Sequence, residues 1–223
     1  MENLPIHIVI NPDLFIKNPN STSLGKRMVS EGIALIDACG FETFTFKKLG
    51  TAIGSNESSI YRYFENKHYF LLYLVNWYWS WVEYKLVFAT GNITSPKDKL
   101  SKAITVLTKP VETDQDFSYI DEVVLHKVIV SESIKSFYTK DVDLENKKGF
   151  HEVYKRVVQR VSDLVAAVNP KFEFPTMLAS TVIESSLQQQ YFSEHLPGLT
   201  NTINDKDDMV TFYLQLVNKT VVE

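Results

Sequence analysis

The sequence has little of several residue types, and each shortage excludes a class of protein. A single cysteine, Cys39, excludes an internal disulfide. With only 8 Gly and 8 Pro, the chain has too few turn residues for a β-sandwich or a collagen-like protein. No apolar run approaches the roughly 18 residues that a membrane-spanning helix needs. We therefore expect a soluble, cytoplasmic, helical protein with no membrane partner.

Basic residues are not in excess either. The 23 Lys and Arg against 27 Asp and Glu give a formal net charge of −4, which excludes indiscriminate binding of nucleic acid by a basic surface. Residues 21–68 are less acidic than the rest, because six basic and five acidic side chains leave them at +1. A local nucleic-acid surface remains compatible with this distribution.

The common catalytic and metal-binding motifs are absent from the sequence. It contains no cysteine cluster, His-Glu-x-x-His pattern, phosphate-binding glycine loop or Gly-x-Ser-x-Gly elbow. Glu122 and His126 stand four residues apart, as two ligands or an acid–base pair would, but a surface pair or a hydrogen-bonded core histidine is the favoured interpretation. Cys39 is most simply a small core residue. We expect no catalytic residue, no cofactor and no metal.

Hydrophobic periodicity predicts an all-α chain. Val29, Ile33 and Ile36 recur at helical spacing, and Gly40 follows as a helix stop. Pro and Gly divide the remainder into segments of helical length. The predicted helices cover residues 23–39, 46–53, 57–63, 66–90, 97–109, 116–138, 146–168, 176–196 and 205–222.

These helices suggest a small N-terminal domain and a larger helical body. We predict a flank at residues 1–20, a three-helix domain at 21–68 and a helical domain at 69–223. Residues 1–20 match no pattern; they form either an ordered flank, which we prefer, or an arm near DNA that carries Lys17.

Two short helices, 46–53 and 57–63, have the length and spacing of a helix-turn-helix, with Gly54 in the tight turn. In such a motif the second helix presents its N-terminal side chains to the major groove of DNA. Most of the side chains left off the core face, from Asn56 to Tyr63, can form hydrogen bonds with base edges and phosphates.

These residues resemble a known family. Gly40-Phe-Glu-Thr-Phe-Thr-Phe46, Leu49-Gly-Thr-Ala-Ile-Gly54 and Ser58-Ser-Ile-Tyr-Arg-Tyr-Phe-Glu-Asn-Lys67 resemble the DNA-binding domain of TetR-family transcriptional regulators, over roughly residues 24–72. The resemblance implies an N-terminal DNA-binding domain followed by a helical domain for effector binding and dimerisation. Gly50, inside a helix, departs from the alanine of the family pattern.

The resemblance also implies DNA-binding positions. Thr45 and Lys67 match phosphate-contacting positions, Asn56 the cap of the recognition helix and Glu57 a base-reading position; Glu57 could instead only favour the helix N-terminus as an acid. We favour DNA contact over core packing for Tyr61 and Tyr63. The expected DNA-binding residues are Thr45, Lys47, Lys48, Asn56, Glu57, Ser58, Tyr61, Arg62, Tyr63 and Lys67.

Three of these residues also stand out physically. Lys47, Lys48 and Lys67 lie in the first turns of predicted helices, where a cation opposes the helix dipole. Phosphate contacts would explain this placement, because phosphates favour helix N-termini. The alternative is that the three lysines are simply solvated.

An aromatic series on the fourth predicted helix is the expected effector site. Tyr73, Trp77, Trp81, Tyr84 and Phe88 share one face, while Trp79 points roughly opposite. Such a series is most often core, but the family resemblance implies that the same helix lines a cavity for an unknown, largely apolar effector. The expected ligand-binding residues are Tyr73, Trp77, Trp81, Tyr84, His126 and Gln188, with Gln189 as a further polar candidate.

The last two predicted helices match the region through which the family dimerises as a four-helix bundle. Small residues, including Ala179 and Ser180, would permit close helix approach, and a two-fold dimer would fit a palindromic operator. The expected interface residues are Leu178, Val182, Ser185, Ser186, Phe192, Tyr213, Leu214 and Val217.

The sequence thus predicts a homodimeric, ligand-responsive repressor that binds double-stranded DNA. The alternative is a helical protein-interaction module with the same fold that has lost operator binding. A helical enzyme is the third class, for which the sequence offers no catalytic constellation.

Overall fold

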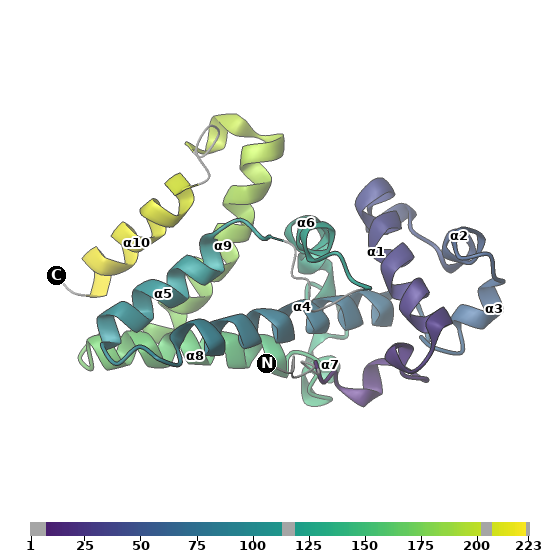
Figure 1. Ribbon diagram of the computed structural model, residues 1–223, viewed down its shortest axis with the longest axis horizontal. Coiled ribbons are helices and arrows are strands. Elements are labelled where there is room, and N and C mark those ends of the chain that lie inside the picture. Colours follow the sequence, from purple (N-terminus) through teal and green to yellow (C-terminus); the bar gives the residue numbers. More distant parts are fainter. Residues whose placement is uncertain (1–7, 113–118, 202–206, 222–223) are drawn as a thin grey trace, which may run out of the picture. The chain divides into compact units, whose positions relative to one another are not determined.

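The computed structural model describes residues 8–112, 119–201 and 207–221, and every regular element in these ranges is a helix (Figure 1). The predicted all-α class is therefore confirmed. The α-helices of the described residues are α1 (Ser23–Thr43), α2 (Phe46–Ala52), α3 (Glu57–Ile60), α4 (Lys67–Thr90), α5 (Pro96–Thr108), α6 (Glu122–Glu132), α7 (Val142–Lys147), α8 (Glu152–Val168), α9 (Pro175–His195) and α10 (Asp207–Val221). Four 3-10 helices accompany them: η1 (Pro12–Leu14), η2 (Pro19–Ser21), η3 (Ser133–Ser136) and η4 (Pro197–Leu199).

The helices belong to two compact units. The first unit comprises Met1–Ser80 and Val111–Glu152, and the second comprises Trp81–Pro110 and Val153–Glu223. The division differs from the predicted boundary at 68/69, because α6 and α7 group with the N-terminal helices. Helix α4 contributes its first half to one unit and its second half to the other. Among the described residues, no helix combines the length and apolarity that crossing a bilayer requires.

Side-chain caps begin the three N-terminal helices. Thr22 accepts a hydrogen bond from the Gly25 N–H, Thr45 accepts one from Lys48, and the Asn56 side chain accepts one from Ser59. Each cap satisfies a backbone donor that the first turn of a helix leaves without a partner. The core between these helices is aromatic. Its buried rings have centroids 5.0 to 6.4 Å apart and belong to Phe44, Phe46, Phe64 and Phe70.

The segment before α1 is part of the first unit. Leu14 is fully buried, and the Ile16 N–H donates to the Tyr63 carbonyl over 2.8 Å. The Asn20 side chain accepts hydrogen bonds from the Tyr73 and Tyr119 hydroxyls. Residues 8–20 of the predicted flank are therefore held against the first unit, as in the interpretation that we preferred over an arm, while residues 1–7 lie outside the described residues.

Helix α4 is buried on nearly all sides along its centre. From Phe70 to Val82 every residue except Ser80 is buried. A helix that is apolar all round belongs in the interior of a protein. All three tryptophans lie in this stretch and are at most 4% exposed, including Trp79, which sequence reasoning placed opposite the other two.

The second unit is built on amphipathic helices. In α8, Val153, Val157, Val161 and Val165 recur every fourth residue and are all buried. Helix α10 packs against α5 and α9, and the Asn169 amide donates to the carbonyl of Val221 at the end of α10. Burial of these apolar faces stabilises the unit.

Two glycines define breaks that the sequence suggested only in part. Gly40 has a φ of 73°, which breaks the regular helix at the predicted position. One further turn after this break extends α1 to Thr43. Gly149, with a φ of 78°, separates α7 from α8. The prediction of one helix over 146–168 is therefore wrong, because Gly149 adopts a conformation that other residues rarely take. The beginnings of the predicted helices 116–138 and 205–222, and residue 222, lie outside the described residues.

Candidate functional site

Helices α2 and α3 form the helix-turn-helix. Gly54 makes the turn with a φ of 63°, and the Ser55 N–H donates to the Gly50 carbonyl over 2.8 Å. A Cβ atom on Gly50 would lie 3.1 Å from the Ser55 carbonyl oxygen. Gly50 is therefore suited to the close approach of the turn to α2, which outweighs its low helix propensity.

The recognition helix presents a polar face to solvent. Asn56, Ser58, Tyr61 and Arg62 are exposed, and Glu57 is half-exposed. The Asn56 side-chain oxygen accepts hydrogen bonds from the Ser59 N–H at 2.9 Å and from the hydroxyls of Ser58 and Ser59 at 2.7 Å each. Asn56 is thus the predicted cap, and its oxygen is fully engaged, which leaves the amide N–H groups to contact a ligand.

Glu57 and Tyr61 form a pair on this face. The Tyr61 hydroxyl donates to the Glu57 Oε1 over 3.3 Å, and the Tyr61 ring lies edge-on against Phe46 with centroids 5.1 Å apart. The ring is therefore fixed at its base and exposed at its hydroxyl end. Among the described residues, the second oxygen of the Glu57 carboxylate has no hydrogen-bond donor.

Tyr63 departs from the prediction that both tyrosines point outward. Its side chain is 4% exposed, and its hydroxyl is 2.7 Å from the Thr22 hydroxyl. Helix α3 ends at Ile60, and the Tyr63 N–H bonds to the Ile60 carbonyl three residues back. The tighter turn rotates Tyr63 into the core, so that outward placement is confirmed for Tyr61 and wrong for Tyr63.

Lys67 is engaged by the protein itself. Its ammonium group donates to the carbonyls of Phe41 at 3.0 Å, Glu42 at 3.1 Å and Phe44 at 3.4 Å. It also lies 4.7 Å from the centroid of the Phe41 ring. A cation at the carbonyl end of a helix interacts favourably with the dipole, so Lys67 stabilises the end of α1 rather than standing free for a phosphate.

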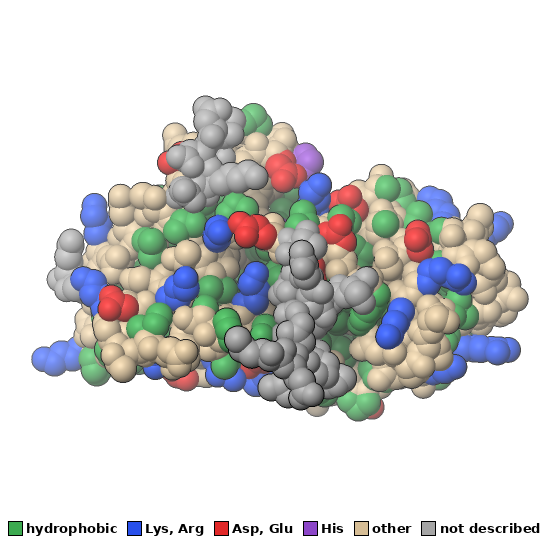
Figure 2. All heavy atoms as spheres, viewed as in Figure 1, with side chains coloured by type: hydrophobic (Ala, Val, Ile, Leu, Met, Phe, Trp, Pro, Cys, Tyr) green, Lys and Arg blue, Asp and Glu red, His purple; other side chains and the backbone are tan. Residues whose placement is uncertain are grey.

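The other basic and hydroxyl residues of the motif lie on the surface. Thr45, Lys47 and Lys48 are exposed, and Lys48 also donates to the Thr43 carbonyl over 2.8 Å. Figure 2 shows Lys and Arg side chains over the α1–α3 part of the face in view. Lys47 and Arg62 therefore provide exposed positive charge beside the recognition helix.

Lys67→Met is expected to lower the free energy of unfolding by about 2 kcal/mol, because three carbonyls lose a charged donor. Denaturant unfolding of the full chain measures this change. Lys47→Met is the matched control, because Lys47 is exposed and should change stability by no more than about 0.5 kcal/mol. Wild-type stability of Lys67→Met, together with weaker DNA binding, would restore the phosphate-contacting role.

The aromatic series of α4 is packed rather than open. Tyr73, Trp77 and Trp81 are at most 1% exposed, and burial raises the pKa of the Tyr73 hydroxyl. Only Tyr84 of the expected ligand-binding aromatics is half-exposed, stacked on Phe88 with centroids 6.1 Å apart. The three buried aromatics are core residues, because their surface is already covered by the fold.

The polar candidates also differ from the expectation. His126 is buried, and its Nδ1 lies 2.8 Å from the Tyr78 hydroxyl. Burial raises the pKa of Tyr78, so the hydroxyl stays protonated and can donate to the ring nitrogen. His126 is therefore the hydrogen-bonded core histidine that we favoured. Gln188 is exposed on α9 and Gln189 is half-exposed.

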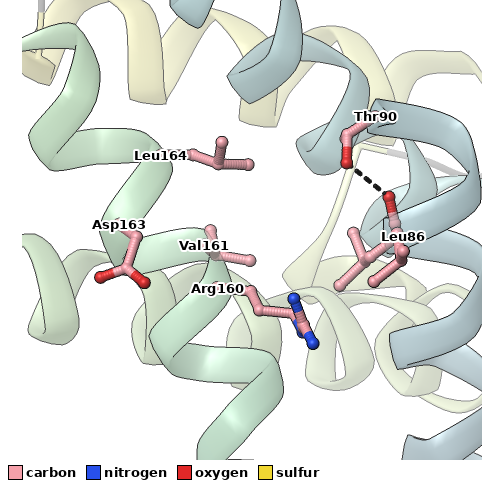
Figure 3. Close-up of a pocket in the computed structure, with 7 residues that line it drawn as sticks. Leu86, Thr90, Arg160, Val161, Asp163 and Leu164 are labelled. Atoms are coloured by element: carbon pink, nitrogen blue, oxygen red, sulfur yellow. Dashed lines mark hydrogen bonds between the residues drawn. The ribbon is translucent and has the colours of Figure 1, made fainter. Parts of the chain in front are cut away.

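A groove in the second unit was missed by sequence reasoning. It has a volume of about 200 Å³ and lies between α4 and α8 (Figure 3). No role was assigned to Arg160 from the sequence, and its four-residue spacing from Arg156 is only a weak signal. The lining residues are Leu86, Val87, Thr90, Arg160, Val161, Asp163 and Leu164.

Half of the expected dimer interface is internal to the second unit. Val182, Ser186, Tyr213 and Val217 are at most 2% exposed in the single chain. The Tyr213 hydroxyl donates to Ser185 over 2.9 Å, which ties α10 to α9. These four residues therefore form the core that joins the two helices, and cannot also offer free surface. Leu178, Ser185, Phe192 and Leu214 are half-exposed.

A different face of α9 and α10 is exposed. In α9 six of the exposed residues recur at alternating steps of four and three, a pattern typical of helix–helix seams. They are Met177, Thr181, Glu184, Gln188, Tyr191 and His195, and Thr176 and Glu194 are exposed beside them. In α10 the corresponding residues are Asp208, Phe212, Gln215 and Lys219.

No protein-family model and no curated protein matches the chain, but solved structures do. A bacterial regulatory protein in the tetR family from Rhodococcus RHA1 is similar with a TM-score of 0.61 and 14% identity, over 90% of this chain and 97% of its own. AibR in complex with isovaleryl coenzyme A and operator DNA is similar with a TM-score of 0.58 and 13% identity, over 88% of this chain and 97% of its own. The superantigen PfiT is similar with a TM-score of 0.59 and 14% identity, over 90% of this chain and 97% of its own.

These likenesses define the class of fold. The chain is an all-α protein with an N-terminal helix-turn-helix and a C-terminal helical region. The arrangement is the fold of TetR-family regulators, and the resemblance first seen in residues 24–72 extends over most of the chain. Because identity is low and one similar structure is a superantigen, the fold alone does not establish the activity.

Proposed function

We propose that the chain is a TetR-family transcriptional regulator, a cytoplasmic, non-enzymatic protein that binds operator DNA through α2 and α3. The observation that carries this proposal is the polar face of the recognition helix. Asn56, Ser58, Tyr61 and Arg62 are exposed on a motif whose large aliphatic side chains are buried. Hydrogen-bonding groups on a rigid helix are what base and phosphate contacts require.

The proposed assembly is a homodimer that reads a palindromic operator. The exposed seam of α9 and α10 supports it, with Met177 66% and Phe212 54% exposed in the single chain. Two copies of this seam related by a two-fold axis would bury these side chains in a four-helix bundle. The symmetric dimer would then place one recognition helix in each half-site.

The proposed mode of regulation is repression relieved by a small effector. The groove of the second unit offers a place for it within the described residues. The similar structure of AibR holds isovaleryl coenzyme A together with operator DNA, which supports an acyl compound as the kind of ligand to test. Effector binding would favour a dimer whose helix spacing no longer fits the operator.

The test is binding to the DNA upstream of the chain's own gene. Affinity should fall steeply with salt, and Lys47→Ala should reduce the salt slope by about 1, because one phosphate contact is lost. Fluorescence anisotropy measures the affinity, and light scattering should give a dimer at micromolar concentration. The matched control is Lys171→Ala, which removes an exposed lysine from the other unit.

Equal affinity for upstream and random duplexes would contradict specific regulation. It would favour the alternative of a protein-interaction module, because the similar structure of the superantigen PfiT indicates that this fold is not confined to transcriptional regulators. A monomer that binds an operator normally would contradict the dimer alone.

A further inference from the structure

We propose that the groove between α4 and α8 binds a compact aliphatic monocarboxylate, with the carboxylate on Arg160 and the alkyl chain along α8 and the end of α4. The effect of such a ligand on DNA binding rests on the proposed function, whereas the binding itself does not. Three observations carry the assignment: the lining of the groove, the anchorage of Arg160 and the local balance of charge.

The floor of the groove is apolar. Leu86 is 3% exposed and Val161 1%, and Leu164 is half-exposed beside them. Figure 3 shows Leu164 and Val161 pointing from α8 into the space toward Leu86. The Thr90 hydroxyl already donates to the Leu86 carbonyl over 2.7 Å, so it adds little polarity. Such a surface favours an alkyl group, because its burial removes apolar area from water.

Arg160 offers a fixed cationic group at the edge of this floor. Its Nε donates to the Glu83 Oε1 over 2.8 Å, which anchors the guanidinium group. Its two terminal nitrogens have no hydrogen-bond partner among the described residues, and in Figure 3 they lie on the side of the groove that faces α4. A guanidinium group held at Nε presents its remaining donors in a planar arrangement that fits a carboxylate.

The charges around Arg160 favour a single negative charge. Glu83 accepts from both Arg156 and Arg160, so two cations share one anion. Partial burial raises the pKa of Glu83, but the hydrogen bonds from Arg156 and Arg160 lower it overall and keep the carboxylate ionised. Asp163 accepts from Gln159 over 2.7 Å, and in Figure 3 its carboxylate points away from α4. Arg156, Arg160 and Glu83 together carry one positive charge, and the negative charge of Asp163 points away from α4, so a singly charged carboxylate suits this side of the groove better than a dianionic phosphate.

The size of the groove limits the ligand. Sites for drug-sized molecules usually enclose about 300–1,000 Å³, and this groove has about 200 Å³. A short acyl chain with its carboxylate therefore fits this volume better than a sterol or a long fatty acid. Hexanoate is a suitable probe, and hexan-1-ol is its neutral counterpart of similar size.

The experiment is titration of the full-length, isotope-labelled protein with hexanoate, without DNA, followed by NMR. Hexanoate should shift the amide signals of residues 86–90 and 160–164 in a saturable manner. Hexan-1-ol should bind about tenfold more weakly or worse, because it cannot accept the bidentate, charge-assisted pair. Hexyl phosphate should also bind more weakly than hexanoate, which separates a carboxylate site from a general oxyanion site.

Variants then assign the role of Arg160. Arg160→Gln should weaken hexanoate binding about tenfold or more. The hexanoate affinity of Arg160→Lys should lie between those of the wild type and Arg160→Gln, because lysine keeps the charge but loses the planar donor group. Lys171→Gln is the matched control, since it removes an exposed cation from the same unit that neither pairs with Glu83 nor lines the groove. It should retain hexanoate affinity within about threefold.

Each contrary outcome overturns the assignment. The assignment is overturned by shifts that leave both of these segments unchanged, by equal binding of hexan-1-ol, by unchanged affinity of Arg160→Gln, or by no saturable shift at tens of millimolar hexanoate. Operator binding is measured on the same samples by anisotropy. Binding of hexanoate without operator binding would support this site and contradict the proposed function. Operator binding without hexanoate binding would contradict only the site.

Discussion

Trp81→Ala is expected to lower the free energy of unfolding by about 3–5 kcal/mol, the largest stability loss that we predict for a single substitution. The side chain is 1% exposed, so its removal leaves a cavity in the centre of α4 that neighbouring residues fill only in part. The Lys85 ammonium group, 4.3 Å from the Trp81 ring centroid, loses its aromatic partner as well. Denaturant unfolding followed by far-UV circular dichroism measures the loss.

Trp81→Phe is the control that separates packing from ligand contact. It retains an aromatic ring and should recover much of the lost stability, because a smaller cavity remains. If Trp81 is core, Trp81→Phe should bind hexanoate with wild-type affinity. If Trp81→Ala instead keeps wild-type stability but loses a ligand-induced response, the sequence-based expectation of an effector site on the aromatic face is correct and the packing interpretation is wrong.

The fold was predictable because its signals are local. Thr45 and Asn56 begin helices through their own side-chain hydrogen bonds, and Gly54 makes the turn between them. Caps and turns depend on residues a few positions apart, so the sequence displays them directly. The continuous apolarity of residues 70–82 was equally visible and corresponds to a helix buried on nearly all sides.

The roles of individual side chains were less predictable, because they depend on partners distant in sequence. The Tyr63 hydroxyl contacts the Thr22 hydroxyl, and Lys67 donates to the carbonyls of Phe41, Glu42 and Phe44, contacts that no local pattern shows. The helical period suggested an outward side chain for Tyr63, and the family resemblance suggested a phosphate contact for Lys67, but each side chain is engaged by a tertiary contact instead. A lysine at the N-terminus of one helix can donate hydrogen bonds to the free carbonyls at the C-terminus of a neighbouring helix.

The groove was missed for the same reason. Arg160 and Val161 are adjacent in α8, and their functional meaning depends on Glu83 and Leu86 of α4, more than seventy residues earlier. On sequence alone, α8 is an amphipathic helix with charged residues on its solvent side. Only the packing of α8 on α4 brings a guanidinium group and an apolar floor to one place.

Glu57→Gln is expected to change the base preference of operator binding at one position in each half-site. Glu57 lies in the first turn of α3, and only its Oε1 is engaged, by the Tyr61 hydroxyl at 3.3 Å. A carboxylate that enters the major groove is repelled by phosphates unless it accepts a hydrogen bond, and the amino group of cytosine is the suitable donor. Glutamine prefers adenine, to which it bonds in a bidentate manner.

The expected size of the change is about tenfold in the ratio of cytosine to adenine affinities, since such contacts discriminate by ~1–3 kcal/mol. Anisotropy titrations against operators substituted at each position measure it. Tyr61→Phe is the companion variant: it removes the hydroxyl that holds the carboxylate and should weaken the cytosine preference while leaving the ring on Phe46. The salt slope should stay unchanged in both variants, because neither removes a phosphate contact.

The competing explanation of Glu57 predicts a different result. If the acid only favours the N-terminus of α3, Glu57→Gln should cost a few tenths of a kcal/mol of stability and leave every base preference as it was. Stability and specificity are measured on the same purified variant, so the two explanations are separated directly. Unchanged preference at all positions, with normal affinity, would assign Glu57 to the helix terminus and leave base reading to Asn56, Ser58 and Arg62, the other exposed polar groups of this surface.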